Sequence, residues 1–156
     1  MSVKGDSSQV WLSEYCCAVF EENRNLPSLS VTGSSQGLGR ALLDNILAAG
    51  ERVVATLRKT EQLEALKNQY PATQLLILRL DVTNASEIDY VFEETRKTFG
   101  RLDIVVNNAA YVLSSEIETT PIEEARKQLD VLLWGPVQIC QQVIVADLMS
   151  TVIASC

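Results

Sequence analysis

Three glycines with a fixed spacing are the residues of this chain whose types most directly suggest chemistry. Gly33, Gly37 and Gly39 lie within residues 32–39, Thr-Gly-Ser-Ser-Gln-Gly-Leu-Gly, between an apolar segment and a helical pattern. Such a turn can lead a strand into a helix whose first backbone amides bind a phosphate. Without a Cβ, Gly33 permits the tight turn, Gly37 lets a pyrophosphate approach the backbone, and Gly39 lets the helix pack closely on the strand. Because glycine-rich turns also occur in loops that bind nothing, the motif needs support from elsewhere in the chain.

Three further groups of residues follow predicted strands and supply that support. They are Arg58 after the strand 52–56, Asp81 and Val82 after the strand 74–80, and Asn107, Asn108, Ala109 and Ala110 after the strand 102–106. The carboxyl ends of parallel strands meet at one edge of an open α/β sheet, where such sheets bind ligands. We therefore expect these groups and the glycine turn to form one dinucleotide site.

Each group has a chemical role in such a site and a simpler structural explanation. The planar guanidinium of Arg58 can pair with a ribose 2′-phosphate. No acidic residue stands at this strand end to hold a 2′-hydroxyl, which favours NADP over NAD. Asp81 can accept a hydrogen bond from the adenine amino group, and the Asn107-Asn108 pair can bond across neighbouring strands. The alternatives are a solvated charge at Arg58, a turn or capping role for Asp81, and an ordinary turn at the two asparagines.

Strand and helix patterns alternate from residue 32 onward and predict how these residues are positioned. Besides the three strands above, helices are predicted at 37–49, at 61–69, from a cap at Asn84 to Gly100, and from Pro121 onward. Repeated β–α units imply an α/β fold, a three-layer Rossmann-like parallel sheet with flanking helices.

Composition narrows the classes of protein that the chain can belong to. Its 156 residues are enough for one domain with a hydrophobic core. A content of 47% hydrophobic and 21% charged residues is typical of globular proteins. A net charge of −7 argues against a nucleic-acid partner. No apolar run approaches the roughly 20 residues of a membrane span, and no signal-peptide pattern is present, so we expect a cytoplasmic protein with no membrane partner. The four cysteines lack metal-ligand spacing and histidine is absent, so no metal site is expected.

Taken together, the motifs resemble the short-chain dehydrogenase/reductase family. Its pattern T-G-x-x-x-G-x-G matches residues 32–39, its D-V pair matches Asp81-Val82, and its N-N-A-G motif matches residues 107–110 with Ala110 in the last place. Residues 50–59 also resemble members that use NADP. The resemblance covers about residues 31–142. It implies hydride transfer between NADP(H) and a small-molecule carbonyl or alcohol.

The resemblance also assigns residues to parts of the cofactor. The pyrophosphate and its ribose would contact Gly33, Ser35, Gln36, Gly37, Leu38 and Gly39. Arg58 would bind the 2′-phosphate, Asp81 and Val82 the adenine, and Asn108 and Ala109 the adjoining ribose.

The chain departs from the family in its catalytic residues. The family uses a tyrosine with a lysine four residues later, a serine, and an asparagine on the fourth helix. Here the fourth residues after Tyr15, Tyr70, Tyr90 and Tyr111 are Val19, Gln74, Glu94 and Ser115, and the asparagine position falls at Leu132. We therefore assign no catalytic residue and expect this polypeptide not to turn over substrate. The alternatives are a non-catalytic NADP-binding module and a non-functional truncated product.

The family's strand order predicts 3-2-1-4 for this chain, a sheet truncated at its C-terminal side. Thr151 to Ser155 resembles a stub of the fifth strand, but we expect the strand 102–106 to be an exposed edge. Family members often form dimers or tetramers through their fourth and fifth helices. Because only the fourth lies within these residues, a homo-oligomer is weakly supported.

Residues 1–30 fit this architecture poorly, so we place the cofactor-binding domain at 31–156 and an irregular segment before it. Gln9 to Leu12 resembles the start of the first strand and Val31 to Gly33 its end, which makes 13–30 an insertion. Ser13-Glu14-Tyr15 can be encoded by codons that contain a splice-donor sequence, and the codons before Val31 can provide an acceptor. We hypothesise that 13–30 is a translated intron; the alternative is a natural insertion.

Overall fold

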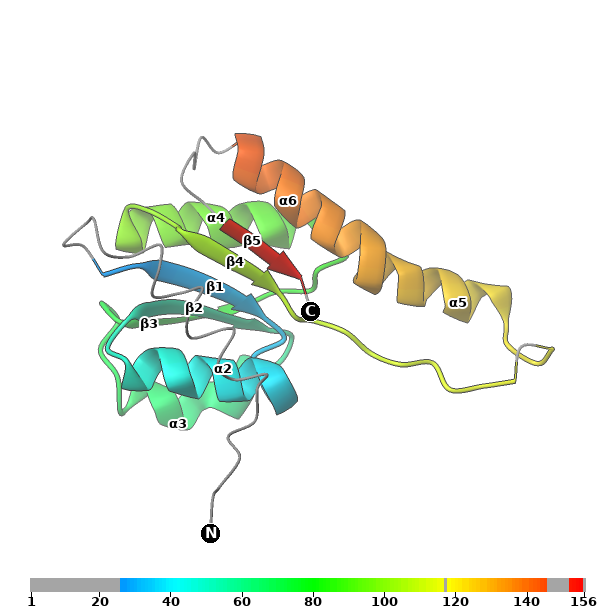
Figure 1. Ribbon diagram of the computed structural model, residues 1–156, viewed down its shortest axis with the longest axis horizontal. Coiled ribbons are helices and arrows are strands. Elements are labelled where there is room, and N and C mark those ends of the chain that lie inside the picture. Colours follow the sequence, from blue (N-terminus) through cyan, green and yellow to red (C-terminus); the bar gives the residue numbers. More distant parts are fainter. Residues whose placement is uncertain (1–25, 117, 146–151, 156) are drawn as a thin grey trace, which may run out of the picture.

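A parallel sheet of five strands forms the centre of the molecule. The computed structural model describes residues 26–116, 118–145 and 152–155. The strands run in the spatial order β3-β2-β1-β4-β5 (Figure 1). They are β1 (Ser28–Thr32), β2 (Arg52–Leu57), β3 (Leu75–Arg79), β4 (Ile104–Asn107) and β5 (Val152–Ser155).

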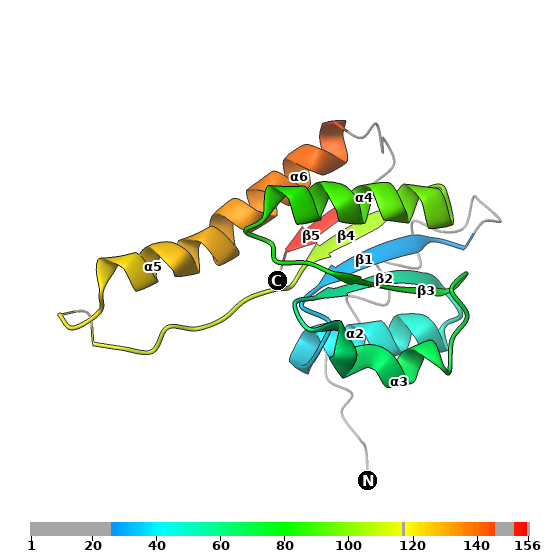
Figure 2. The ribbon, with the colours of Figure 1, turned by 180° about the vertical axis from the view of Figure 1, so that it is seen from behind.

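Helices cover both faces of this sheet, which confirms the predicted three-layer α/β fold. On one face lie α2 (Gly37–Ala48) and α3 (Glu64–Lys67), the latter preceded by a 3-10 turn at Thr60–Leu63. On the other lie α4 (Ala85–Phe99) and α6 (Gly135–Val145), as Figure 2 shows from behind. The helix α5 (Ile122–Leu129) extends away from the sheet and joins α6 through a π-helical turn at Asp130–Trp134 (Figure 1). No helix of the described ranges is long and apolar enough to cross a bilayer.

The period-two alternation of the strands divides the core into two clusters. Leu29 and Val31 of β1 face α2 and pack with Leu43. On the opposite face Val54 and Val105 pack with residues of α4 and α6, Phe92 and Ile139 among them. The central strands are therefore covered on both faces, as expected for a parallel sheet.

Strand pairing confirms the predicted order 3-2-1-4 and corrects one consequence drawn from it. The expectation that β4 is an exposed edge is wrong, because β5 pairs with it in parallel, from Ile104 opposite Val152 to Asn107 opposite Ser155. Residues 152–155 of the predicted stub thus form the fifth strand. Its pairing satisfies backbone groups of β4 that would otherwise face solvent.

The first strand begins before the domain boundary expected at residue 31. Ser28, Leu29 and Ser30 pair with Arg52, Val53 and Val54 of β2, so the last part of the expected insertion 13–30 belongs to the sheet. Residues 1–25, including the strand start expected at Gln9 to Leu12, lie outside the described residues.

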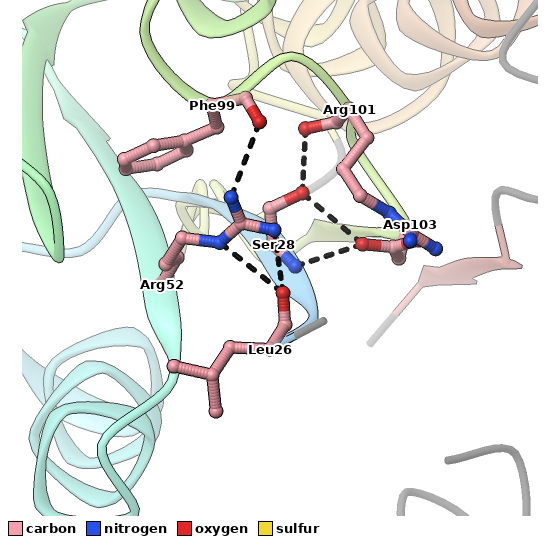
Figure 3. A network of polar contacts seen from close by, with 6 residues as sticks. All are labelled: Leu26, Ser28, Arg52, Phe99, Arg101 and Asp103. Atoms are coloured by element: carbon pink, nitrogen blue, oxygen red, sulfur yellow. Dashed lines mark hydrogen bonds and ion pairs between the residues drawn. The ribbon is translucent and has the colours of Figure 1, made fainter. Parts of the chain in front are cut away.

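A polar network explains how a serine can be buried at the start of this strand (Figure 3). The carboxylate of Asp103 accepts hydrogen bonds from the backbone nitrogen of Ser28 at 2.8 Å and from its hydroxyl at 3.1 Å. The same hydroxyl donates to the carbonyl of Arg101 at 2.5 Å, and Arg101 pairs with Asp103. Arg52 donates to the carbonyls of Leu26 and Phe99. The network thus connects the first residues of β1 and β2, through hydrogen bonds, to the segment before β4.

Local signals account for the ends of α4. The side chain of Asn84 accepts hydrogen bonds from the backbone nitrogens of Ser86 and Glu87, and Gly100 ends the helix with φ +75°. Both ends agree with the prediction. The long helix predicted from Pro121 does begin there, but the π-helical turn divides it.

Candidate functional site

The turn from β1 into α2 has a backbone geometry that requires glycines. Gly33 and Gly37 have φ of +68° and +60°. A Cβ on Gly33 would lie 2.9 Å from the Cα of Ala109, and a Cβ on Gly39 would lie 2.5 Å from the carbonyl oxygen of Gly33. At Gly37 nothing lies within 4 Å of the corresponding position. Gly33 and Gly39 therefore serve close packing, whereas Gly37 leaves open space in front of the backbone.

The start of α2 is exposed and has no side-chain cap. Gln36 is the N-cap residue, its side chain makes no capping hydrogen bond, and the first turn contains no acidic residue. Gln36, Gly37 and Leu38 are exposed and Ser35 is half-buried. The uncapped amides and the positive end of the helix dipole suit an anionic group.

Ser34 holds the same turn to the sheet. Its backbone nitrogen donates to the carbonyl of Thr56 at 3.1 Å, and its hydroxyl donates to the carbonyl of Val31 at 2.6 Å. Sequence reasoning missed this residue, although its place inside the glycine motif was a usable signal.

Asn108 and Thr32 join the end of β4 to the glycine turn. The Asn108 amide donates to the carbonyls of Thr32 at 2.8 Å and Gly33 at 3.3 Å. In return, the Thr32 hydroxyl oxygen accepts from the backbone nitrogens of Asn108 and Ala109, both at 2.9 Å. The expected bonding across strands is therefore made by Asn108. Asn107 is buried and turns its amide toward Cys140 of α6 instead.

Asp81 makes the turn contacts that the sequence offered as one of its two possible roles. One carboxylate oxygen accepts from the nitrogen and hydroxyl of Thr83 at 3.0 and 2.7 Å, which is the turn role. Burial tends to raise the pKa of Asp81, but the Thr83 hydrogen bonds and the positive charges of Arg58 and Arg79 outweigh it and hold the pKa below the usual value of 3.8. Asp81 is thus a charged acceptor at the end of β3, with its second oxygen available to a ligand donor.

Three further residues complete this part of the site. Glu87 accepts a hydrogen bond from the backbone nitrogen of Asp81 at 2.7 Å and also pairs with Arg79. Three residues after the helix cap at Asn84, the carboxylate of Glu87 therefore holds the Asp81 turn. Arg58 is exposed just after β2, and Val82 is buried against the second core cluster.

The structure thus brings all the sequence-predicted residues to the carboxyl edge of the sheet. Thr32 pairs with Thr56, and Leu57 pairs with Arg79, so the ends of β1, β2 and β3 are level with one another. The edge offers exposed amides, an exposed guanidinium, a carboxylate and close-packed glycines. No group of His, Cys, Asp and Glu within the described ranges is arranged to hold a metal ion.

Comparison with known proteins identifies this arrangement. Residues 28–151 match a family model described as short chain dehydrogenase. The chain belongs to the short-chain dehydrogenase/reductase family. It is 38% identical over 112 residues to an uncharacterized oxidoreductase of Schizosaccharomyces pombe, covering 72% of this chain and 37% of that protein. It is 34% identical over 114 residues to an oxidoreductase of Botryotinia fuckeliana, covering 73% and 42%.

Solved structures agree with this assignment. A short-chain dehydrogenase from Streptomyces avermitilis superposes with a TM-score of 0.78 at 30% identity, covering 85% of this chain and 49% of the other. One from Bacillus anthracis gives a TM-score of 0.77 at 28% identity, covering 83% and 56%. This short-chain dehydrogenase/reductase therefore spans about half the length, or less, of the relatives it matches.

The departures from the family's catalytic pattern can also be located. Leu132, at the expected asparagine position, lies in the π-helical turn and is exposed. Tyr111 is exposed just after the asparagine motif, with Ser115 in place of a lysine. Of the four tyrosines, Tyr15 lies outside the described residues.

Proposed function

We propose that this chain is the cofactor-binding part of an NADP-dependent short-chain dehydrogenase/reductase. The observation that carries the proposal is the turn at residues 33–39, where close packing at Gly33 and Gly39 is combined with open space at Gly37. A pyrophosphate can approach the backbone there and accept hydrogen bonds from the uncapped amides of α2. When bound, NADP(H) would accept or donate the hydride.

The other predicted residues take the remaining parts of the cofactor. Ser35, Gln36 and Leu38 would flank the pyrophosphate and its ribose, and Asn108 and Ala109 the adjoining ribose. The adenine would lie between Val82 and the carboxylate of Asp81. These assignments rest on their shared place at the carboxyl edge of the sheet.

A preference for NADP over NAD is proposed from Arg58. Its exposed side chain lies near Asp81 and no acidic residue accompanies it at the end of β2. A guanidinium binds a 2′-phosphate with charge-assisted hydrogen bonds, whereas an acidic residue there would repel it.

We further propose that these 156 residues bind the cofactor without turnover. The support is the sequence itself, in which no tyrosine is followed by a lysine four residues later. A small-molecule carbonyl or alcohol is the substrate class proposed for the full-length family. The expected cytoplasmic location stays a prediction.

A thermal and calorimetric titration tests this function. NADPH at one hundred times its dissociation constant should stabilise the native state by about 2.7 kcal/mol. NADH should bind more weakly, and Arg58→Glu should remove the difference between the two cofactors. The control is Arg126→Glu, an equally large charge reversal on the exposed helix α5. A cooperative melt that neither cofactor shifts would contradict the proposal, and NADPH oxidation by pure protein with a carbonyl substrate would contradict the absence of turnover.

A further inference from the structure

Gly135, at the first position of α6, touches the turn that follows β3. A Cβ on this residue would lie 2.8 Å from the carbonyl oxygen of Val82 and 2.9 Å from its Cγ2. Gly135 has an ordinary helical φ of −58°, so its backbone conformation would accept any residue. Space alone therefore requires a glycine here.

The expected effect of an alanine substitution on stability indicates what this contact does. Glycine is a poor helix former, so replacing it with alanine inside a helix normally stabilises a protein. At Gly135 the added methyl group would meet the backbone of Val82, which cannot turn aside as a flexible side chain can. The close approach thus fixes the distance between α6 and the Val82 turn.

The residues around Gly135 show that this face of the helix meets the candidate site. Val131, one helical turn earlier, packs against the core cluster that includes Val82. Leu132, Leu133 and Trp134 point outward and are exposed. The π-helical turn at Asp130–Trp134 therefore leads into α6 with Val131 against the core cluster and Gly135 against the turn that follows β3.

We propose that Gly135 is a positioning residue for the adenine end of the cofactor site. Gly135 acts through Val82, because the first turn of α6 lies directly on the carbonyl of Val82. This contact holds Val82 and the neighbouring Asp81 in the positions where the adenine is expected. This inference rests on the proposed function, because it assumes that the nucleotide binds beside Val82.

Binding of NADPH and of its adenine half, 2′,5′-ADP, to Gly135→Ala tests the proposal. We expect both ligands to bind about tenfold more weakly, by the same factor, because overpacking displaces Val82 alone. The control is Gln141→Ala, an alanine substitution on the exposed side of the same helix, which should leave both affinities within about twofold. If the wild type binds both ligands and Gly135→Ala binds them equally well, this inference fails and the proposed function stands. If the wild type binds neither, both fail.

Hydrogen exchange of the unmodified protein gives a second test that does not depend on the variant's folding. Binding of 2′,5′-ADP should slow amide exchange in a peptide covering residues 131–140, because the ligand holds Val82 against α6. Calorimetric binding of 2′,5′-ADP with unchanged exchange in that peptide would overturn the proposal.

Discussion

Thr32 and Asn108 each satisfy the backbone of the other. The hydroxyl oxygen of Thr32 accepts from the backbone nitrogen of Asn108 at 2.9 Å, and the side-chain amide of Asn108 donates to the carbonyl of Thr32 at 2.8 Å. The two residues lie at the carboxyl ends of β1 and β4, far apart in the sequence. Their exchange of hydrogen bonds fixes the glycine turn relative to the neighbouring strand.

Thr32→Val should therefore destabilise the protein despite its similar shape. The backbone nitrogens of Asn108 and Ala109 would both lose their acceptor, at a cost of about 1–3 kcal/mol in the free energy of unfolding. Urea denaturation measures the change. Thr95→Val is the matched control, because that buried hydroxyl donates only to Val91 within its own helix. Equal losses for the two variants would contradict the role assigned to the Thr32 hydroxyl.

Asp103→Ala should destabilise the opposite end of the sheet. It leaves the buried backbone nitrogen of Ser28 without its acceptor (Figure 3), at a cost of about 1–3 kcal/mol. Asp44→Ala removes an exposed ion pair with Arg40 and should cost less than about 0.5 kcal/mol. Chemical denaturation of both variants checks the prediction, which fails if Asp44→Ala is the more costly change.

Glu51→Gln should stabilise the protein at neutral pH. Burial raises the pKa of Glu51 above its ordinary value of 4.5, so the folded state holds the charged form at a cost. That cost is fully present above the folded pKa and disappears as the pH falls below the unfolded value. The advantage of the glutamine variant in thermal melts should therefore vanish near pH 4, and an advantage independent of pH would show that burial of the charge is not its cause.

Mature transcripts should lack the codons for residues 13–30 if that segment is a translated intron. Its removal would place residues 10–12, Val-Trp-Leu, where Ser28, Leu29 and Ser30 now form the start of β1. Ser28 and Ser30 are both buried in a central strand, a position where apolar residues are usual. Sequencing of spliced messages decides the matter, because the hypothesis fails if those codons persist in all of them.

The ends of α4 could be predicted from the sequence, because they depend on residues close together in the chain. Asn84 caps α4 and Gly100 ends it because a capping side chain and a left-handed residue act on adjacent backbone groups. The strand-end residues of the site were predictable because the edge of a parallel sheet brings them together. Pairing of β5 with β4 and the participation of Ser28 in β1 were less accessible, since both depend on partners distant in the sequence. The contact between Gly135 and Val82 likewise depends on how the π-helical turn rotates α6, which no spacing in the sequence reveals.

Cofactor binding by Gly37→Ala, compared with Gly50→Ala, is the sharpest test of the phosphate site at the glycine turn. Both glycines have positive φ, +60° and +80°, and neither has any atom within 4 Å of an added Cβ. Each substitution should therefore cost a similar strain of about 1–2 kcal/mol in the folded protein. Only the methyl group at position 37 stands where the pyrophosphate approaches the backbone. We expect calorimetry to show NADPH binding at wild-type affinity for Gly50→Ala and at least about tenfold weaker binding for Gly37→Ala; equal affinities for the two variants would contradict a pyrophosphate site at this turn.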